Sequence, residues 1–184
     1  CYTTGSVASI SSGTSSVYSI AGGLAGSLLN TTMTHCCSTA SVLCSSYTNS
    51  TNSLASCVAG GLVGRSTQSS ITSSYSTGSI TAESTSLYQS TINCGGLVGV
   101  SNSSTITNCY STGWITAPSS HSTLTSTIGG LAGVEVEGAI SSGSFWDMDT
   151  SGLTAGLGHG SSTGLTGKTT AEMQDLSTFV SSGW

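Results

Sequence analysis

A five-residue box of the form Gly-Gly-Leu-x-Gly recurs four times and is the feature that most restricts the fold of this chain. The four copies lie at Gly22–Gly26, Gly60–Gly64, Gly95–Gly99 and Gly129–Gly133. Their first glycines are 38, 35 and 34 residues apart. Self-similarity at a period of this size is typical of repeat arrays, in which each unit buries its apolar face only against its neighbours. The sequence therefore predicts a stack of repeats of about 35 residues.

A second box follows the first at a matched offset. It reads ITSSYSTGSI at Ile71–Ile80 and ITNCYSTGWI at Ile106–Ile115, and a degenerate copy, MTHCCSTASV, lies at Met33–Val42. The chain opens with CYTTGSV at Cys1–Val7, and the last unit carries AISSGSFWD at Ala139–Asp147. Two boxes at matched offsets in consecutive units strengthen the prediction of a repeat architecture.

The second box alternates in the way that is typical of a β-strand. In this pattern Ile106, Asn108 and Tyr110 are expected on one face of the strand and the intervening residues on the other. Tyrosine and β-branched residues also favour strands. The leucine of each Gly-Gly-Leu is expected to point into the core, and its paired glycines suit a place where backbones approach closely.

The segments after the second box are predicted to turn, return briefly as a strand and then leave the core. The Thr-Gly pair predicts a turn because glycine adopts positive φ without a steric penalty. A second short strand is expected at Ser79–Thr81 and at Trp114–Thr116. The Ser/Thr-rich stretches Glu83–Gln89 and Pro118–Ser126 are predicted to be surface loops.

These elements predict an all-β fold, a β-solenoid (a β-helix or a stack of β-arches) of about four to five coils with parallel strands. Residues 1–143 are expected to form the repeat array and residues 144–184 a closing segment. Thr169 and Glu172 form a capping box that predicts a short helix at Ala171–Leu176. We expect this helix, with Phe179 and Trp184, to cap the C-terminal end of the stack.

The pattern GGLVG…ITNCYSTG resembles the GLUG-motif repeats of secreted and cell-surface proteins of bacteria and archaea, over nearly the whole chain. Ser144–Gly152 and Thr166–Phe179 are similar to the segment that often closes such arrays. The resemblance implies a β-solenoid and a surface location, and it implies no single activity. The scarcity of charge together with the cysteines also resembles the sheath proteins of filamentous methanogenic archaea, which self-associate through β-arches into insoluble tubes.

Composition excludes several functions. Only 5% of the residues are charged and the only cations are Lys168 and Arg65, so no nucleic-acid partner or anionic membrane surface is expected. No apolar run approaches the roughly 20 residues that span a bilayer, so we expect no membrane insertion. Disorder is an alternative for a polar, low-complexity chain, but 36% hydrophobic residues at regular positions argue against it. The chain does not begin with Met, and we interpret it as a mature, processed product.

The seven cysteines indicate disulfides in an oxidising compartment, because none has the spacing of a zinc site. They are Cys1, Cys36, Cys37, Cys44, Cys57, Cys94 and Cys109. An odd number leaves at least one thiol free or bonded to another chain. Cys1 and Cys36 occupy the same repeat position on adjacent coils, so they can form a bridge, although packed thiols, an interchain bond or lipidation of Cys1 are alternatives. Cys57 and Cys94 precede successive boxes two residues out of register, and the remaining pairing stays open.

Three other patterns suggest sites. Asp147, Asp149 and Ser151 resemble the start of a calcium loop, with an Asx-type turn as the alternative. No other cofactor is expected, because Thr166–Thr170 lacks the full phosphate-loop pattern. The sequons at Asn30, Asn49 and Asn102 lie in predicted turns or loops, where glycosylation can occur.

No catalytic residue is predicted, so we expect a protein that is not an enzyme. The acidic pair Glu135 and Glu137, expected on one strand face, is the best candidate for polysaccharide cleavage, but a solvated strand face is the preferred interpretation. Ice binding is a further alternative, although Thr-x-Thr does not repeat in register.

The leading hypothesis is an extracellular structural protein, a self-assembling subunit of a cell-surface filament, sheath or layer held by β-edge contacts and disulfides. Its expected partners are other copies of itself, because head-to-tail contacts that do not close make filaments. The alternative is a surface adhesin or passenger module that binds glycans through exposed aromatics such as Trp114 and Trp146.

Overall fold

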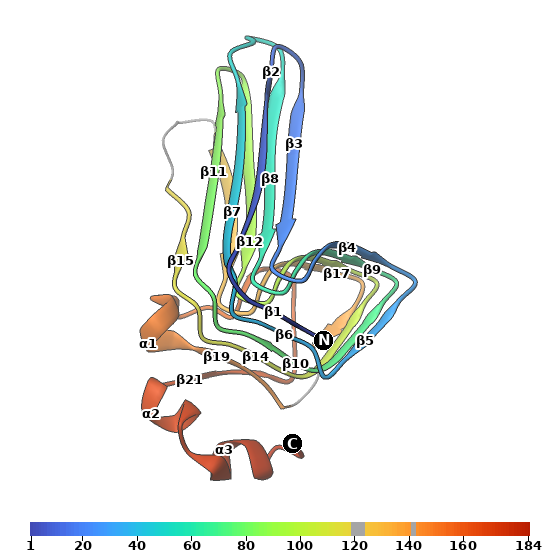
Figure 1. The fold of residues 1–184 in the computed structure, drawn as a ribbon, viewed down its shortest axis with the longest axis vertical. Coiled ribbons are helices and arrows are strands. Elements are labelled where there is room, and N and C mark those ends of the chain that lie inside the picture. The colour runs from blue at the N-terminus through green and yellow to red at the C-terminus, as the bar shows by residue number, and fades with distance from the viewer. Residues whose placement is uncertain (119–123, 141–142) are drawn as a thin grey trace.

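The computed structural model describes residues 1–118, 124–140 and 143–184, in which the chain winds through four parallel β-sheets (Figure 1). Each of the first four coils contributes to every sheet in turn, whereas the closing segment adds strands only to the eight-stranded and the five-stranded sheet. Each strand pairs in parallel with its counterparts in the adjacent coils. The predicted β-solenoid is confirmed, and the sheets number four to eight strands.

Sheet 1 has eight strands and forms one wall of the body. Its strands are β1 (Tyr2–Thr3), β5 (Thr32–Thr34), β6 (Cys37–Ser38), β10 (Ser70–Ser76), β14 (Thr105–Ser111), β18 (Ala139–Ile140), β19 (Ser144–Asp147) and β21 (Leu165–Lys168). Sheet 4, with five strands, forms the wall that meets it at a corner. Its strands are β4 (Ala25–Leu29), β9 (Val63–Thr67), β13 (Val98–Asn102), β17 (Ala132–Val136) and β20 (Leu157–His159).

Sheets 2 and 3 have four strands each and together form an arm that projects from the body (Figure 1). Sheet 2 contains β2 (Ser6–Gly13), β7 (Ser41–Thr48), β11 (Ile80–Ser86) and β15 (Ile115–Thr116). Sheet 3 contains β3 (Val17–Gly22), β8 (Leu54–Gly60), β12 (Gln89–Gly95) and β16 (Leu124–Gly129). Three short helices follow β19, namely α1 (Met148–Ser151), α2 (Thr170–Met173) and α3 (Leu176–Val180).

The boxes align in register along the stack. Gly22, Gly60, Gly95 and Gly129 are partners in successive strands of sheet 3, and Ile71 pairs with Ile106 in sheet 1. The box leucines Leu62, Leu97 and Leu131 are fully buried in the body. The predicted stacking of like residues is therefore confirmed, and it produces a continuous apolar column along the axis.

The arm corrects the prediction of a surface loop at Glu83–Gln89. β11 continues to Ser86 and β12 begins at Gln89, so only two residues separate these strands. The arm interior holds small polar side chains, and Ser84 donates a hydrogen bond from Oγ to the carbonyl of Ala55 on the facing sheet at 3.0 Å. Buried hydroxyls with partners explain why a Ser-rich segment forms strands here. In the second stretch, β16 begins at Leu124 and residues 119–123 lie outside the described chain.

The expected single alternation of the second box is also wrong. Asn108 has φ 48°, as does Ser73 at the same position of the preceding coil, and the ladder between β10 and β14 skips both residues. This left-handed residue shifts the alternation by one, so Cys109 faces the interior and Tyr110 faces outward. A second column of left-handed corners lies at Asn30, Gln68, Ser103 and Glu137.

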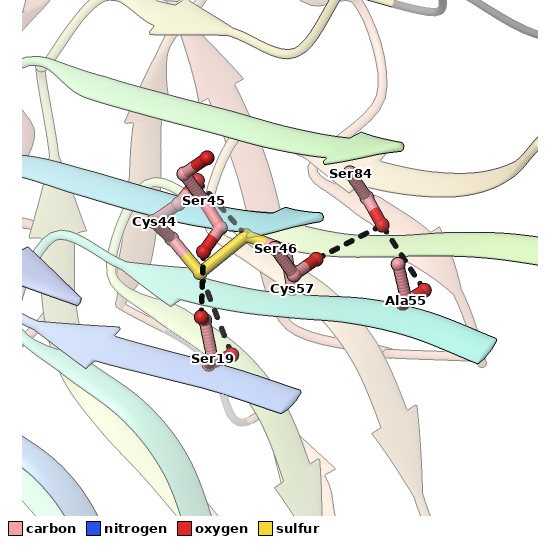
Figure 2. Close-up of a disulfide and its surroundings, with 7 residues drawn as sticks. All are labelled: Ser19, Cys44, Ser45, Ser46, Ala55, Cys57 and Ser84. Atoms are coloured by element: carbon pink, nitrogen blue, oxygen red, sulfur yellow. Dashed lines mark hydrogen bonds between the residues drawn. A yellow bond between two sulfur atoms is a disulfide. The ribbon is translucent and has the colours of Figure 1, made fainter. Parts of the chain in front are cut away.

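The two sheets of the arm are joined by a disulfide between Cys44 of β7 and Cys57 of β8, with their Cα atoms 6.0 Å apart (Figure 2). Both residues are fully buried. Around them, Ser19 Oγ donates to the carbonyl of Ser45 at 2.7 Å, and Ser46 Oγ donates to Ser84 Oγ at 3.0 Å. The bridge therefore joins the two sheets within an apolar cluster that includes Val42, Ile80 and Ile92.

Removing this bridge is expected to destabilise the chain by about 3 kcal/mol, because a cross-link over a short loop restricts the unfolded state. The change is the double variant Cys44→Ala/Cys57→Ala, and the measurement is the urea midpoint with and without a thiol reductant. The reductant should lower the midpoint of the parent chain and leave that of the double variant unchanged. Equal sensitivity of both proteins would contradict the assignment of the bridge.

The last glycine of the box is expected to tolerate alanine only in the first coil. A Cβ on Gly99 would lie 2.6 Å from the carbonyl oxygen of Gly64, whereas a Cβ on Gly26 would have its nearest contact at 3.8 Å. Overpacking costs about 1–3 kcal/mol, more when backbone must move. Gly99→Ala should therefore lower the free energy of unfolding by at least that much, and the matched control Gly26→Ala should change it little. Similar effects would argue against the alignment of the boxes.

Candidate functional site

A groove lies between the outer face of sheet 1 and the C-terminal segment. It encloses a cavity of about 760 Å³. Strands β10 and β14 form its floor, and residues of α1, α2, α3 and the chain after α3 form its other side. The C-terminal helices were expected to cap the end of the stack. Instead they lie alongside this wall, as Figure 1 shows.

Two stacked tyrosines form the centre of the floor. Tyr75 and Tyr110 are partners in the register of β10 and β14, and their rings lie 4.8 Å apart with an angle of 3° between their planes. A hydrogen bond with Cys37 raises the pKa of Tyr75, and burial contributes further. Burial, with smaller effects of Tyr75 and Cys37, raises the pKa of Tyr110 to about 12. Both rings therefore carry neutral hydroxyl groups at physiological pH.

The C-terminal segment is held against this floor by aromatic contacts. The rings of Phe179 and Trp184 lie 5.5 and 5.6 Å from that of Tyr110, and Phe179 also contacts Phe145 at 5.8 Å. Trp184 donates a hydrogen bond from Nε1 to the carbonyl of Gly143 at 2.8 Å. These contacts make a partly exposed aromatic cluster with a fixed geometry.

The base of the closing segment is organised by Asp147, which lines the groove but is buried. Its carboxylate accepts hydrogen bonds from the backbone N–H groups of Asp149 and Thr150 and from Thr170 Oγ1 at 2.8 Å. Asp149 accepts from the N–H of Thr170 at 2.9 Å, and Ser151 Oγ donates to the carbonyl of Asp147 at 2.6 Å. Asp147 thereby caps α1 and links it to α2.

These contacts are those of the Asx-type turn that was the alternative to a calcium loop. All three candidate ligands, Asp147, Asp149 and Ser151, have hydrogen-bond partners within the chain. Among residues 1–118, 124–140 and 143–184, no cluster of three or more His, Cys, Asp or Glu side chains is arranged to hold a metal. Calcium binding remains a prediction without support from this geometry.

Polar side chains without a fixed partner line the rest of the groove. Thr150 Oγ1 is buried and has no hydrogen-bond partner. Thr77, Thr112 and Gln174 also line the cavity, and the structure shows no side-chain hydrogen bond from them to another described residue. Neither Lys nor Arg lines the groove, and Lys168 pairs with Glu172 at 3.5 Å outside it. The site is therefore amphipathic, with hydroxyl and amide groups beside aromatic rings and no available cation.

The cysteines form one disulfide, Cys44–Cys57, and the other five are free thiols in the structure. Cys1 and Cys36 lie on adjacent coils as expected, because Cys37 donates its backbone N–H to the carbonyl of Cys1 at 2.9 Å. The predicted option of a Cys1–Cys36 bridge is not formed. Cys57 pairs with Ile92, which confirms that Cys57 and Cys94 are out of register by two residues.

Several other predicted sites lie apart from the groove. The sequon residues Asn30, Asn49 and Asn102 are all exposed. Trp114 is 59% exposed on the arm side, whereas Trp146 is 7% exposed and packs in the body core, so the expectation of an exposed Trp146 is wrong.

The acidic pair does not share a strand face. Glu135 is buried and accepts a hydrogen bond from the backbone N–H of Gly138, whereas Glu137 is exposed at a left-handed corner. Of this pair, only Glu137 is therefore available at the surface.

The sequence suggested Trp114 and Trp146 as glycan contacts, and it did not predict the groove. The signal that could have found it is the tyrosine at the same position in two consecutive second boxes. Because equivalent positions stack in adjacent coils, Tyr75 and Tyr110 had to lie ring over ring. The contribution of Phe179 and Trp184 had no such signal, because the closing segment does not repeat.

The in-register coils and the two-box unit define the chain as a repeat protein of the β-solenoid class. The GLUG motif matches residues 55–81 and 90–116, so the chain contains two GLUG motifs. Each match begins in a strand of sheet 3 and ends in the first residues of a strand of sheet 2, so it contains both boxes of one repeat unit. No curated protein and no solved structure matches the chain. The repeat and the fold suggest a structural or surface protein.

One further finding concerns membranes. None of the helices in the described part of the chain has the length and apolar character needed to cross a bilayer.

The buried free thiols are expected to resist alkylation until the chain unfolds. Burial raises the pKa of Cys94 and of Cys109 from 9.0 to about 12. Because the folded pKa exceeds the unfolded one, deprotonation favours unfolding, and the stability contributed by the neutral thiols falls as pH rises from 9.0 towards about 12. Iodoacetamide labelling at pH 8, followed by peptide mass spectrometry, should modify the exposed Cys1 first.

The control is the same labelling in denaturant, where all five free thiols should react. Rapid native labelling of Cys94 would contradict the burial of this thiol.

Proposed function

We propose that this chain is an extracellular structural protein that self-associates end to end into a filament, sheath or layer on the cell surface. The observation that carries the proposal is the uncharged, apolar outer surface of the first coil. Self-association requires an edge that accepts another strand, and the strands β1, β2, β3 and β4 each pair on one side only within the described chain.

The first coil differs from the later coils at its outward positions. Ile10 is 68% exposed, and Tyr18 and Leu29 are each 63% exposed. In the adjacent coil, the partners of these three residues are Ser45, Ser56 and Thr67. The three apolar side chains at these positions support a contact of the first coil with protein rather than with water.

The same edge also lacks the usual protection against strand addition. Natural edge strands often carry lysine, proline or inward-pointing charges that prevent pairing with another chain. Residues 1–64 contain no Asp, Glu, Lys, Arg or Pro. A second copy that brings its strands against this edge meets no like charge, which supports another copy of the chain as the partner.

An oxidising location fits the covalent chemistry. Disulfides persist in extracellular compartments, and the Cys44–Cys57 bridge joins the two sheets of the arm. The exposed Cys1 thiol lies beside the proposed contact and is the candidate for an interchain disulfide. Neither the groove nor the acidic residues supply a catalytic arrangement, so a structural role is preferred to an enzymatic one.

A second candidate, a glycan-binding surface module, is favoured by the aromatic groove on sheet 1. The two functions do not exclude each other, because the groove and the first-coil edge involve different residues.

Charge on the first coil is expected to prevent assembly. The variant Ile10→Lys/Tyr18→Lys places two cations beside the edge, and the matched control is Tyr47→Lys, which changes an exposed residue of β7 in the next coil. Sedimentation velocity and electron microscopy should show filaments for the parent chain and for the control, and monomers for the double variant. A parent chain that stays monomeric at high concentration would refute the proposal. A closed dimer would refute the filament.

A further inference from the structure

We propose that the groove on sheet 1 binds a neutral saccharide, with Tyr75 and the closing segment forming the subsite. The inference concerns a different surface from the first-coil edge, so it does not depend on self-association. It uses the cavity of about 760 Å³, the aromatic cluster and the unpaired polar groups that line it. Cavities of roughly 300–1,000 Å³ with aromatic walls and a few placed polar groups are typical of small-ligand sites.

The aromatic groups match one face of a sugar ring. A pyranose presents its C–H groups on one face, and these pack on the electron-rich faces and edges of aromatic rings. Tyr75 and Tyr110 are held as a stacked pair by the register of the coils, and Trp184 is fixed by its hydrogen bond to Gly143. The rings therefore stay in place without a ligand, which reduces the entropy lost on binding.

The polar groups match the hydroxyls of the same ligand. Gln174 can both donate and accept, as can Thr77 and Thr112, and all three line the cavity. A ligand with hydroxyls around a ring satisfies such a mixed set better than an apolar ligand, which would leave these groups unpaired.

The charges of the groups that line the groove favour a neutral ligand over an anionic one. No Lys or Arg lines the groove, so a carboxylate, sulfate or phosphate on the ligand would meet no permanent cation, and His35 is the one basic side chain among the described residues that line it. The carboxylate of Asp147 is buried and already accepts hydrogen bonds from three groups of the chain. Its negative charge also disfavours an anionic ligand. The groove therefore fits neutral hexoses or N-acetylhexosamines and not uronic acids.

The test is binding of three neutral disaccharides, cellobiose, maltose and N,N′-diacetylchitobiose, with digalacturonic acid as the anionic comparison. Saturation-transfer NMR and Trp fluorescence are measured on the Ile10→Lys/Tyr18→Lys variant, so that assembly does not affect the signal. We expect binding of at least one neutral disaccharide below about 10 mM and none of the acid. If no neutral disaccharide binds, or if the acid binds as well, the proposal fails.

Variants locate the site. Tyr75→Ala and Gln174→Ala should each weaken binding about tenfold, the effect of losing one packed ring or one hydrogen bond. Both residues are partly or fully exposed, so the fold should be retained, which circular dichroism checks. The matched control Trp114→Ala removes an exposed aromatic elsewhere and should leave binding unchanged. Loss of binding in Trp114→Ala alone would place the sugar on the arm and overturn the assignment.

Discussion

In-register stacking of each residue on its counterpart in the next coil is the constraint on which the rest of the structure depends. Parallel strands lie about 4.8 Å apart, so a side chain is always close to the equivalent side chain of the adjacent coil. Glycines stack on glycines in sheet 3 and isoleucines on isoleucines in sheet 1. A charge at such a position would repel its own copy, and Glu83 and Glu135 accordingly pair with Ser45 and Ser101. The scarcity of charge is thus a consequence of the fold.

The same constraint explains which parts of the fold could be predicted from the sequence. The box spacing predicts the register and the burial of the leucines, because both follow from repetition alone. The corners could not be predicted, because residues as different as His35, Ser73 and Asn108 adopt positive φ there and leave no common signal. The arm was missed because Ser84 forms a hydrogen bond to Ala55 of the facing sheet and another to Ser46 of the adjacent coil, and a local pattern does not reveal partners so far away in the sequence.

Only part of the groove could be predicted from the sequence. Its floor follows from the repeat, since Tyr75 and Tyr110 occupy equivalent positions. Its other side comes from a segment that does not repeat, and the hydrogen bond from Asn108 Nδ2 to the carbonyl of Gly183 spans 75 residues. Such long-range contacts carry no periodic signal. The sequence therefore suggested Trp146 as an exposed glycan contact, whereas Trp146 lies in the core and Trp184 lines the groove. The capping box at Thr169 and Glu172 was predictable because it is local, and the structure forms it.

The two proposed surfaces reinforce each other physically. Strand addition at the first coil would lengthen sheet 1, and each added copy would bring its own groove on the same wall. A site built from one aromatic pair and a few hydroxyls is expected to bind a single saccharide weakly, because few groups contribute. Repetition along a rigid stack turns such weak contacts into avidity without any new contact, provided that the ligand spans neighbouring sites. A charge-poor solenoid can therefore act both as a structural element and as a multivalent surface, since its regular stacking sets the spacing between grooves.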